Sequence, residues 1–258
     1  MTAARRKGVL LTLEVATPVV LLALWWVLSS GSTSTFNPPL SEIAQRFVQN
    51  WFGELFVTYF LPSLGRTLAG YAIAVVIGVV GGTVIGLSYV ARRLTGPLVS
   101  FLRSIPGAAL LAPAVTLLGV GDAMKIAIIA FVCVWPILLN TIDGIDEMAP
   151  TQRNTDRIFQ VNGMRRLMWS TLPGASPRIF AGLRTSLALA LIMLVISEMI
   201  ASTGGLGYFI LQAQTTFDVA DMWSGIILLG LLGYALTLAF TFIERRVLRW
   251  YFESKGTA

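Results

Sequence analysis

The chain of 258 residues is 55% hydrophobic and only 12% charged, whereas a soluble domain carries roughly 25% charged residues. This composition excludes an ordinary soluble protein and indicates one that lies in a lipid bilayer. A single cysteine and no histidine also exclude a disulfide framework, a cysteine-histidine zinc site and a histidine-based catalytic triad. We therefore predict neither catalytic residues nor a metal site in this chain.

Apolar segments recur along the chain at lengths that approach or reach the roughly 20 residues needed to cross a bilayer. They predict an all-α, polytopic membrane protein with about six transmembrane helices, organised as a single transmembrane domain over residues 1–258. The predicted spans are residues 9–30, 62–88, 97–119, 122–143, 178–201 and 223–245. An even number of spans places both termini on the same side of the membrane.

Between the first two spans, Pro38 and Pro39 are followed by a pattern typical of a short amphipathic helix. Ser41 is in position to cap its first turn. The apolar residues that would share one face are Ile43, Phe47, Val48 and Trp51. We expect this helix to lie at the outer membrane surface.

The second span carries Gly78, Gly82 and Gly86 at four-residue spacing. This spacing puts the three glycines on nearly one stripe of a helix and allows another helix to approach closely. We interpret the stripe as a packing face and regard a sliding surface as the alternative.

The third span contains Pro106 and Pro113, each of which removes a backbone donor and clashes with the preceding turn. A kinked or broken helix is expected there. Broken helices at membrane depth are tolerated where they are buried in protein or line a cavity, so residues 103–113 are a candidate pathway segment. A simple proline kink is an equally good interpretation of the same pattern.

Two ionisable residues within spans complete the candidate pathway set of Arg103, Pro106, Pro113 and Glu198. Arg103 lies about six residues into its predicted span, or ~9 Å along a helix, which favours snorkelling to the cytoplasmic surface over ligand contact. Glu198 lies near the outer end of the fifth span. It would pair with a helix terminus, line an outer gate or reach water, and reaching water is the commonest outcome.

Lysines and arginines are distributed very unevenly between the two sides of this layout. The side of the termini holds Arg5, Arg6, Lys7, Arg92, Arg93, Arg153, Arg157, Arg165, Arg166, Arg178, Arg245, Arg246, Arg249 and Lys255. The other side holds only Arg46, Arg66 and Lys125. Because basic loops stay in the cytoplasm, this asymmetry predicts that both termini and residues 143–178 are cytoplasmic.

Residues 143–178 form a polar insertion in the apolar chain. Pro150 and Thr151 give a plausible helix start, residues 161–163 supply turn chemistry around an asparagine and a glycine, and Leu172 with Pro173 is expected to end a second short helix. Two short helices at a tight turn would form a compact docking element for another protein. The alternative is an amphipathic loop attracted to lipid headgroups through its arginines, and the pattern alone leaves both open.

Several motifs resemble bacterial ABC importer permeases of the nitrate, sulfonate and taurine type, from about residue 61 to the C-terminus. The polar insertion resembles their "EAA" coupling loop, on the segments Thr155-Asp156-Arg157-Ile158-Phe159-Gln160, Leu172-Pro173, Gly174-Ala175-Ser176-Pro177 and Gly182-Leu183-Arg184. Further similar segments are Ser63-Leu64-Gly65-Arg66, Arg103-Ser104-Ile105-Pro106, Ser197-Glu198-Met199 and Gly204-Gly205-Leu206-Gly207-Tyr208.

The resemblance implies a type I importer permease fold with a cytoplasmic coupling loop at about residues 144–177, docked into a cleft of a separate ATPase. The implied coupling residues are Thr155, Asp156, Gln160, Gly163, Leu172 and Pro173. The chain departs from the family pattern, because Asn154, Thr155 and Asp156 stand where Glu-Ala-Ala is usual and Gln160 stands at the usual glycine.

The resemblance also implies a non-catalytic transport subunit in the bacterial cytoplasmic membrane. Its partners would be ABC ATPase subunits, an extracytoplasmic solute-binding protein and a second permease copy, with no nucleic acid. Consistent with this, the chain has no glycine-rich phosphate loop ending in Gly-Lys-Ser/Thr, so ATP and Mg²⁺ would be bound by the partner. The expected function is import of a small anionic solute such as a sulfonate, nitrate, taurine or organic acid. The alternative is a stand-alone secondary transporter or channel driven by an ion gradient.

Overall fold

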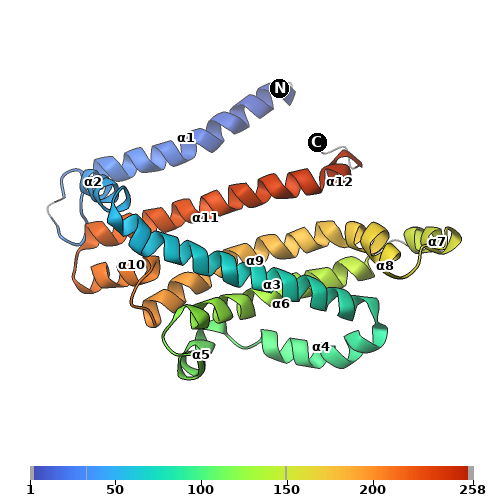
Figure 1. Ribbon diagram of the computed structural model, residues 1–258. Helices are drawn as coiled ribbons and strands as arrows, with labels where there is room; N and C mark the ends of the chain where they lie inside the picture. The colour runs from blue at the N-terminus through green and yellow to red at the C-terminus, as the bar shows by residue number, and fades with distance from the viewer. Residues whose placement is uncertain (1–2, 33, 149, 255–258) are drawn as a thin grey trace.

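Figure 1 shows the computed structural model, which describes the backbone of residues 3–32, 34–148 and 150–254 and their side chains except those of residues 3–15, 150, 153 and 254. Every regular element in these residues is helical, which confirms the all-α class. The α-helices are α1 (Ala3–Ser29), α2 (Leu40–Trp51), α3 (Leu61–Leu87), α4 (Tyr89–Arg103), α5 (Leu111–Leu118), α6 (Asp122–Asp146), α7 (Pro150–Ile158), α8 (Gly163–Arg166), α9 (Leu172–Ile200), α10 (Leu206–Thr215), α11 (Val219–Val247) and α12 (Arg249–Ser254). Two π-helical segments, η1 (Phe56–Phe60) and η3 (Leu167–Thr171), and one 3₁₀ segment, η2 (Gly107–Leu110), connect some of them.

Among the described residues, four helical segments are long and apolar enough to cross a membrane: Phe56–Leu87, Asp122–Asp146, Gly163–Ile200 and Val219–Val247. A fifth candidate is a broken pair, Tyr89–Arg103 with Gly107–Leu118, bent by 81°. The apolar part of α1, Ala16–Ser29, is too short to qualify by itself. The six predicted spans thus correspond to four continuous helices, one broken pair and α1.

The centre of the molecule is a layer of three helices in which α6 packs along both α3 and α9. In Figure 1, α7 and α8 lie at one end of the helices, and the N-terminal end of α1 and the C-terminal end of α11 point the same way. The other end carries α2, α5 and α10. We call residues 150–171 the hairpin, and name the two ends the hairpin end and the opposite end.

The predicted glycine stripe of α3 is confirmed as a packing face against α6. A Cβ added at Gly78 would lie 2.7 Å from Cβ of Ile137. One added at Gly82 would lie 2.7 Å from both the Leu138 carbonyl oxygen and Cβ of Thr141. The two backbones therefore approach more closely than any side chain on this stripe would allow, as is common between membrane helices.

The predicted break in the third span is confirmed, but only one of the two prolines causes it. Pro106 lies in extended backbone between α4 and η2, whereas Pro113 lies in the first turn of α5, where a missing N–H costs no helical bond. The helix before the break also begins earlier than predicted, at Tyr89 instead of residue 97. The reason is a cap, since the Ser88 hydroxyl oxygen accepts a hydrogen bond from the backbone N–H of Ala91 at 3.2 Å.

The expectation that Leu172 and Pro173 end a helix is wrong. The helix runs on from Gly163 to Ile200 through α8, η3 and α9, so the fifth span begins in the hairpin and not at residue 178. The N–H of Leu172 donates to the carbonyl of Leu167, five residues back, which makes a wide π turn directly before the proline. The wider turn accommodates the proline ring and its missing donor without stopping the helix.

The predicted short helix near the outer surface is present as α2, but its cap and its surroundings differ from the prediction. Its N-cap is Pro39 with no side-chain hydrogen bond, so the capping role of Ser41 is wrong. Ile43 is fully buried. The Asn50 amide donates to a carboxylate oxygen of Asp221 at 2.9 Å, which attaches α2 to α11.

Alanine at Gly82 is expected to lower the thermal stability of the purified protein, whereas alanine at the adjacent Gly81 is not. The new methyl group at Gly82 meets backbone and a Cβ, and such overpacking costs about 1–3 kcal/mol. At Gly81 the nearest atom is the end of the Leu138 side chain at 3.7 Å, an ordinary contact. Both variants gain similar helix propensity. Thermal unfolding in detergent measures the difference, and equal midpoints would contradict the close packing of α3 on α6.

Candidate functional site

Two residues with positive φ close the hairpin, Gln160 at 53° and Gly163 at 57°. The N–H of Val161 donates to the carbonyl of Asp156 at 2.9 Å, and that of Gln160 donates to the carbonyl of Arg157 at 3.1 Å, so these bonds end α7. A residue with a side chain adopts this left-handed conformation at a cost of roughly 1–2 kcal/mol. The departure from the family pattern at Gln160 therefore falls where the backbone favours glycine.

A buried carboxylate holds the two halves of the hairpin together. Asp156 of α7 is 7% exposed, and its Oδ2 accepts hydrogen bonds from the Ser170 hydroxyl at 2.8 Å and from Nε of Arg166 at 3.2 Å. Nε2 of Gln152 donates to the carbonyl oxygen of Ser170 at 3.2 Å. These bonds fix α7 against η3, so the hairpin is a compact unit, as the turn chemistry predicts.

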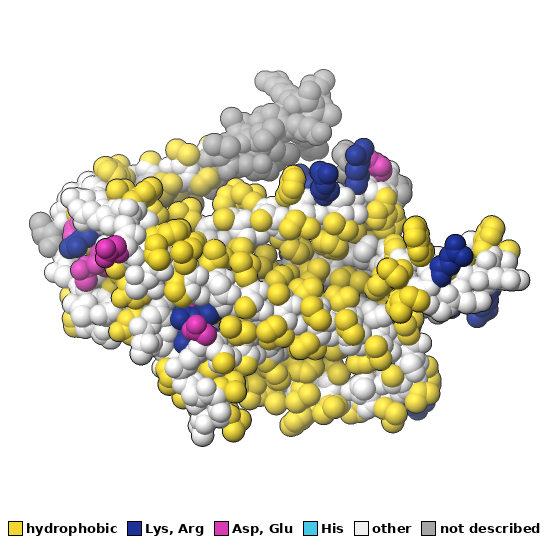
Figure 2. Space-filling view, in the orientation of Figure 1, with side chains coloured by type: hydrophobic (Ala, Val, Ile, Leu, Met, Phe, Trp, Pro, Cys, Tyr) yellow, Lys and Arg dark blue, Asp and Glu magenta, His cyan; other side chains and the backbone are white. Residues whose placement is uncertain are grey.

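The outward surface of the hairpin is apolar and basic. We call its five large exposed apolar side chains the hairpin patch: Ile158, Phe159, Met164, Met168 and Trp169. Arg165 is exposed beside them. Figure 2 shows hydrophobic and basic side chains together on this projecting end of the molecule.

The structure brings the six predicted coupling residues to the hairpin and its junction with α9, where their surroundings differ. Thr155, Gly163 and Pro173 are exposed, Asp156 is buried and Leu172 packs against the helix core. Two further residues of this contact were not predicted from the sequence, the buried Ser170 and the partly buried Gln152. Their polar side chains within an otherwise apolar or basic helix face are the signal that could have identified them.

Two ion pairs fix the ends of the membrane helices next to the hairpin. Arg178 of α9 donates through Nε and Nη2 to the two carboxylate oxygens of Glu147, at 2.7 and 2.6 Å. Arg92 of α4 pairs with Asp146 at 2.7 Å. The end of α6 is thus joined to α9 on one side and to α4 on the other.

Arg103 is the last residue of α4 and is exposed at the break in the third span. The distance of ~9 Å was counted from residue 97, whereas α4 begins at Tyr89, so at a helical rise of ~1.5 Å per residue Arg103 lies about 21 Å along the helix. Its guanidinium has no ion-pair or hydrogen-bond partner among the described residues.

Glu198 does not reach water, contrary to the sequence-based expectation, and is fully buried. Its carboxylate accepts hydrogen bonds from the hydroxyl of Ser63 at 2.8 and 2.9 Å, from Nη1 of Arg66 at 2.6 Å and from the backbone N–H of Gly207 at 2.9 Å. Gly207 lies in the first turn of α10, so the carboxylate occupies the positive end of a helix dipole. Enough donors are present to hold the charge away from water.

Arg66 and Ser63 extend this contact into a cluster that joins α3, α6, α9 and α10 at the opposite end. Arg66 also donates to Asp122 at 2.7 Å and to the carbonyl oxygen of Gly204 at 3.1 Å. The Ser63 hydroxyl oxygen accepts from the N–H of Leu206 at 2.8 Å. Family-like segments more than 130 residues apart in the sequence therefore meet in a single polar cluster.

The structure does not bring the four candidate pathway residues together. A cavity of about 670 Å³ lies beside the break and is lined mainly by small and apolar residues of η2, α5 and residues 200–202, and by none of the four. In the described part of the chain, no group of three or more cysteine, aspartate or glutamate side chains is arranged to hold a metal ion.

Comparison with known proteins gives a consistent result. A family model described as "binding-protein-dependent transport system inner membrane component" matches residues 74–250. The taurine transport system permease protein TauC of Escherichia coli (strain K12) is 26% identical over 249 residues, which cover 94% of this chain and 90% of that protein. The bicarbonate transport system permease protein CmpB of Synechococcus elongatus is 30% identical over 243 residues, covering 88% and 86%. The nitrate import permease protein NrtB of Synechocystis is 29% identical over 237 residues, which cover 88% of this chain and 86% of that protein.

Solved structures show the same fold at low sequence identity. A chain of the inward-facing MetNI methionine ABC transporter superposes with a TM-score of 0.65 at 19% identity, covering 79% of this chain and 96% of that one. A chain of an amino acid ABC transporter superposes with a TM-score of 0.56 at 14% identity, covering 81% of this chain and 96% of that one.

Changing the buried carboxylate Glu198 to Gln is expected to destabilise the protein by about 2–3 kcal/mol, because charged hydrogen bonds to Arg66 and to buried donors are lost. The matched change Asp122→Asn removes the other carboxylate that pairs with Arg66. The Asp122 side chain is 65% exposed, so this change is expected to cost less than about 1 kcal/mol. Thermal or denaturant unfolding in detergent measures both. If the two variants are equally stable, the cluster does not depend on the buried charge.

Proposed function

Because the chain belongs to the family of inner-membrane components of binding-protein-dependent transport systems, we propose that residues 1–258 form one permease domain of an ATP-driven ABC importer. The fold is that of a type I importer permease. The observation that carries the proposed coupling mechanism is the hairpin: a compact element, internally tied by Asp156, that presents an apolar and basic surface beyond the ends of the membrane helices.

The charge distribution supports a bacterial plasma-membrane location with both termini in the cytoplasm. The hairpin end carries the arginines of α7, α8, α9 and the end of α11, as well as Arg92 and Arg93. Arg46, Arg66 and Lys125 belong to the opposite end. Basic residues are retained in the cytoplasm, so the hairpin faces the compartment that holds ATP.

The hairpin patch is the proposed docking surface for an ABC ATPase. Five large apolar side chains in water are costly for a free protein and typical of a protein interface, and Arg165 beside them would guide the approach of a partner. ATP and Mg²⁺ are bound by that partner. At the opposite end, an extracytoplasmic binding protein delivers the solute, and a second copy of this permease completes the pathway.

The solute is proposed to be a small anion. Arg103 supports this, because its exposed guanidinium has no described partner and lies at the break of a membrane helix, where unpaired cations mark ion and substrate pathways. The named solutes of the relatives, taurine, nitrate and bicarbonate, all carry an anionic group.

The docking surface predicts that Phe159→Ser weakens co-purification of the ATPase with the tagged permease by roughly tenfold, since burial of one aromatic side chain contributes about 1.5–3 kcal/mol. The matched control is Phe52→Ser at the opposite end. Phe159 is 73% exposed and Phe52 is 81% exposed, so neither change should affect folding. Equal recovery of the ATPase with both variants would rule out this surface as the docking site.

The pathway role of Arg103 predicts that Arg103→Gln slows uptake of the anionic solute by at least about tenfold, the equivalent of 1.4 kcal/mol. Arg93→Gln on the same helix is the control, because the polar contacts of Arg93 with described residues are all to Tyr89, whose hydroxyl lies at 3.0 Å and whose ring centroid lies at 6.0 Å. Uptake in membrane vesicles is measured for both variants, together with recovery of the ATPase. Normal uptake by Arg103→Gln would exclude it from the pathway.

A further inference from the structure

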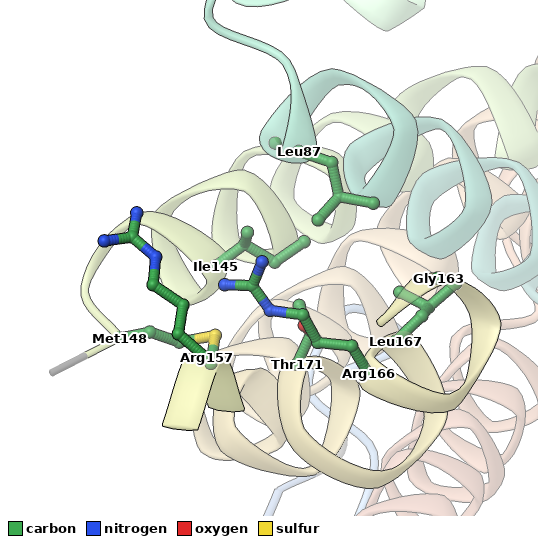
Figure 3. Close-up of a pocket in the computed structure, with 9 residues that line it drawn as sticks. Leu87, Ile145, Met148, Arg157, Gly163, Arg166, Leu167 and Thr171 are labelled. Carbon is green, nitrogen blue, oxygen red and sulfur yellow. The ribbon is translucent and has the colours of Figure 1, made fainter. Parts of the chain in front are cut away.

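A cavity of about 420 Å³ lies on the inner side of the hairpin, between it and the ends of two membrane helices. Figure 3 shows Leu87 of α3 and Ile145 of α6 on one wall, with Arg157 and Arg166 reaching toward them from the hairpin. The Thr171 side chain lies beside Arg166. None of these side chains belongs to the hairpin patch, which lies on the outward surface.

The cavity is positively charged, and of its two arginines only Arg166 has a carboxylate partner among the described residues. No carboxylate lines it. Arg157 has no ion-pair or hydrogen-bond partner among the described residues, and Arg166 uses Nε for Asp156, which leaves its terminal nitrogens available. The Thr171 hydroxyl likewise makes no hydrogen bond to a described residue. Two guanidinium groups and one hydroxyl can together coordinate the oxygens of a phosphate group.

The other walls are apolar, formed by Leu87, Ile145, Met148 and Leu167. Leu87 is the last residue of α3, and Ile145 lies one residue before the end of α6. The cavity is therefore at the level where two membrane spans end, which is the headgroup region of the bilayer. A free inorganic anion would leave these apolar walls unused, whereas a phospholipid offers a phosphate and an apolar chain together.

We propose that this cavity binds the phosphodiester headgroup of an anionic phospholipid. Basic pockets between membrane helices on the cytoplasmic side recognise such headgroups through charge and hydrogen bonding. A lipid held by Arg157 of α7, Arg166 of α8 and the ends of α3 and α6 links the hairpin directly to the membrane helices. The site uses none of the five side chains of the hairpin patch.

The test uses the full-length protein purified in detergent, titrated with phosphatidylglycerol or with zwitterionic phosphatidylcholine and analysed by native mass spectrometry. The wild type is expected to bind phosphatidylglycerol at least about tenfold more tightly than phosphatidylcholine. Arg157→Gln should lose most of this preference. Arg165→Gln, a matched exposed arginine of the hairpin that does not line the cavity, should retain it.

Two further arms separate the remaining explanations. Arg157→Lys keeps the positive charge and should keep most of the preference, which distinguishes loss of charge from loss of fold. Inorganic phosphate alone is tested for thermal stabilisation of the wild type. The site would be overturned if Arg157→Gln kept the full preference for phosphatidylglycerol over phosphatidylcholine, or if Arg165→Gln lost as much of that preference. Its assignment to lipid would be overturned if inorganic phosphate stabilised the wild type and the wild type showed no preference for phosphatidylglycerol.

Discussion

The proposed coupling between the hairpin and the membrane rests on the buried carboxylate of Asp156. It accepts bonds from Ser170 and Arg166, which lie in the segments η3 and α8 that continue without interruption into α9. Because no flexible joint separates these segments, a force applied to α7 is passed directly to a membrane-spanning helix. Hydrogen bonds to a charged group contribute about 1.5–3 kcal/mol each, enough to hold α7 firmly against η3. The bidentate pair of Arg178 with Glu147 connects the same helix to α6.

The two surfaces of the hairpin account for both interpretations that the sequence left open. Its outward surface carries large apolar side chains such as Phe159 and Trp169, which fit a protein partner. Its inward surface carries Arg157 and Arg166 around a cavity at the ends of α3 and α6, which fits a lipid phosphate. A docking element and a lipid-contacting loop are thus compatible, because different side chains of one compact unit serve each.

Local chemistry was predictable from the sequence, and long-range pairing was not. The spacing of Gly78 and Gly82, the break at Pro106 and the turn at Gly163 follow from backbone sterics within a few residues. Glu198 was expected to reach water because its partner Ser63 lies 135 residues earlier in the chain, and no periodicity indicates that contact. The helix through Pro173 was missed for a similar reason, since a π turn that accommodates the ring leaves no sequence pattern.

The most direct test of the account is solute uptake into liposomes that contain the purified permease with its ATPase and binding protein. We expect uptake only when ATP is supplied on the hairpin side and the ATPase is present, because the hairpin is the proposed docking site of the ATPase. Uptake by the permease alone, driven by an ion gradient without ATPase, would contradict it.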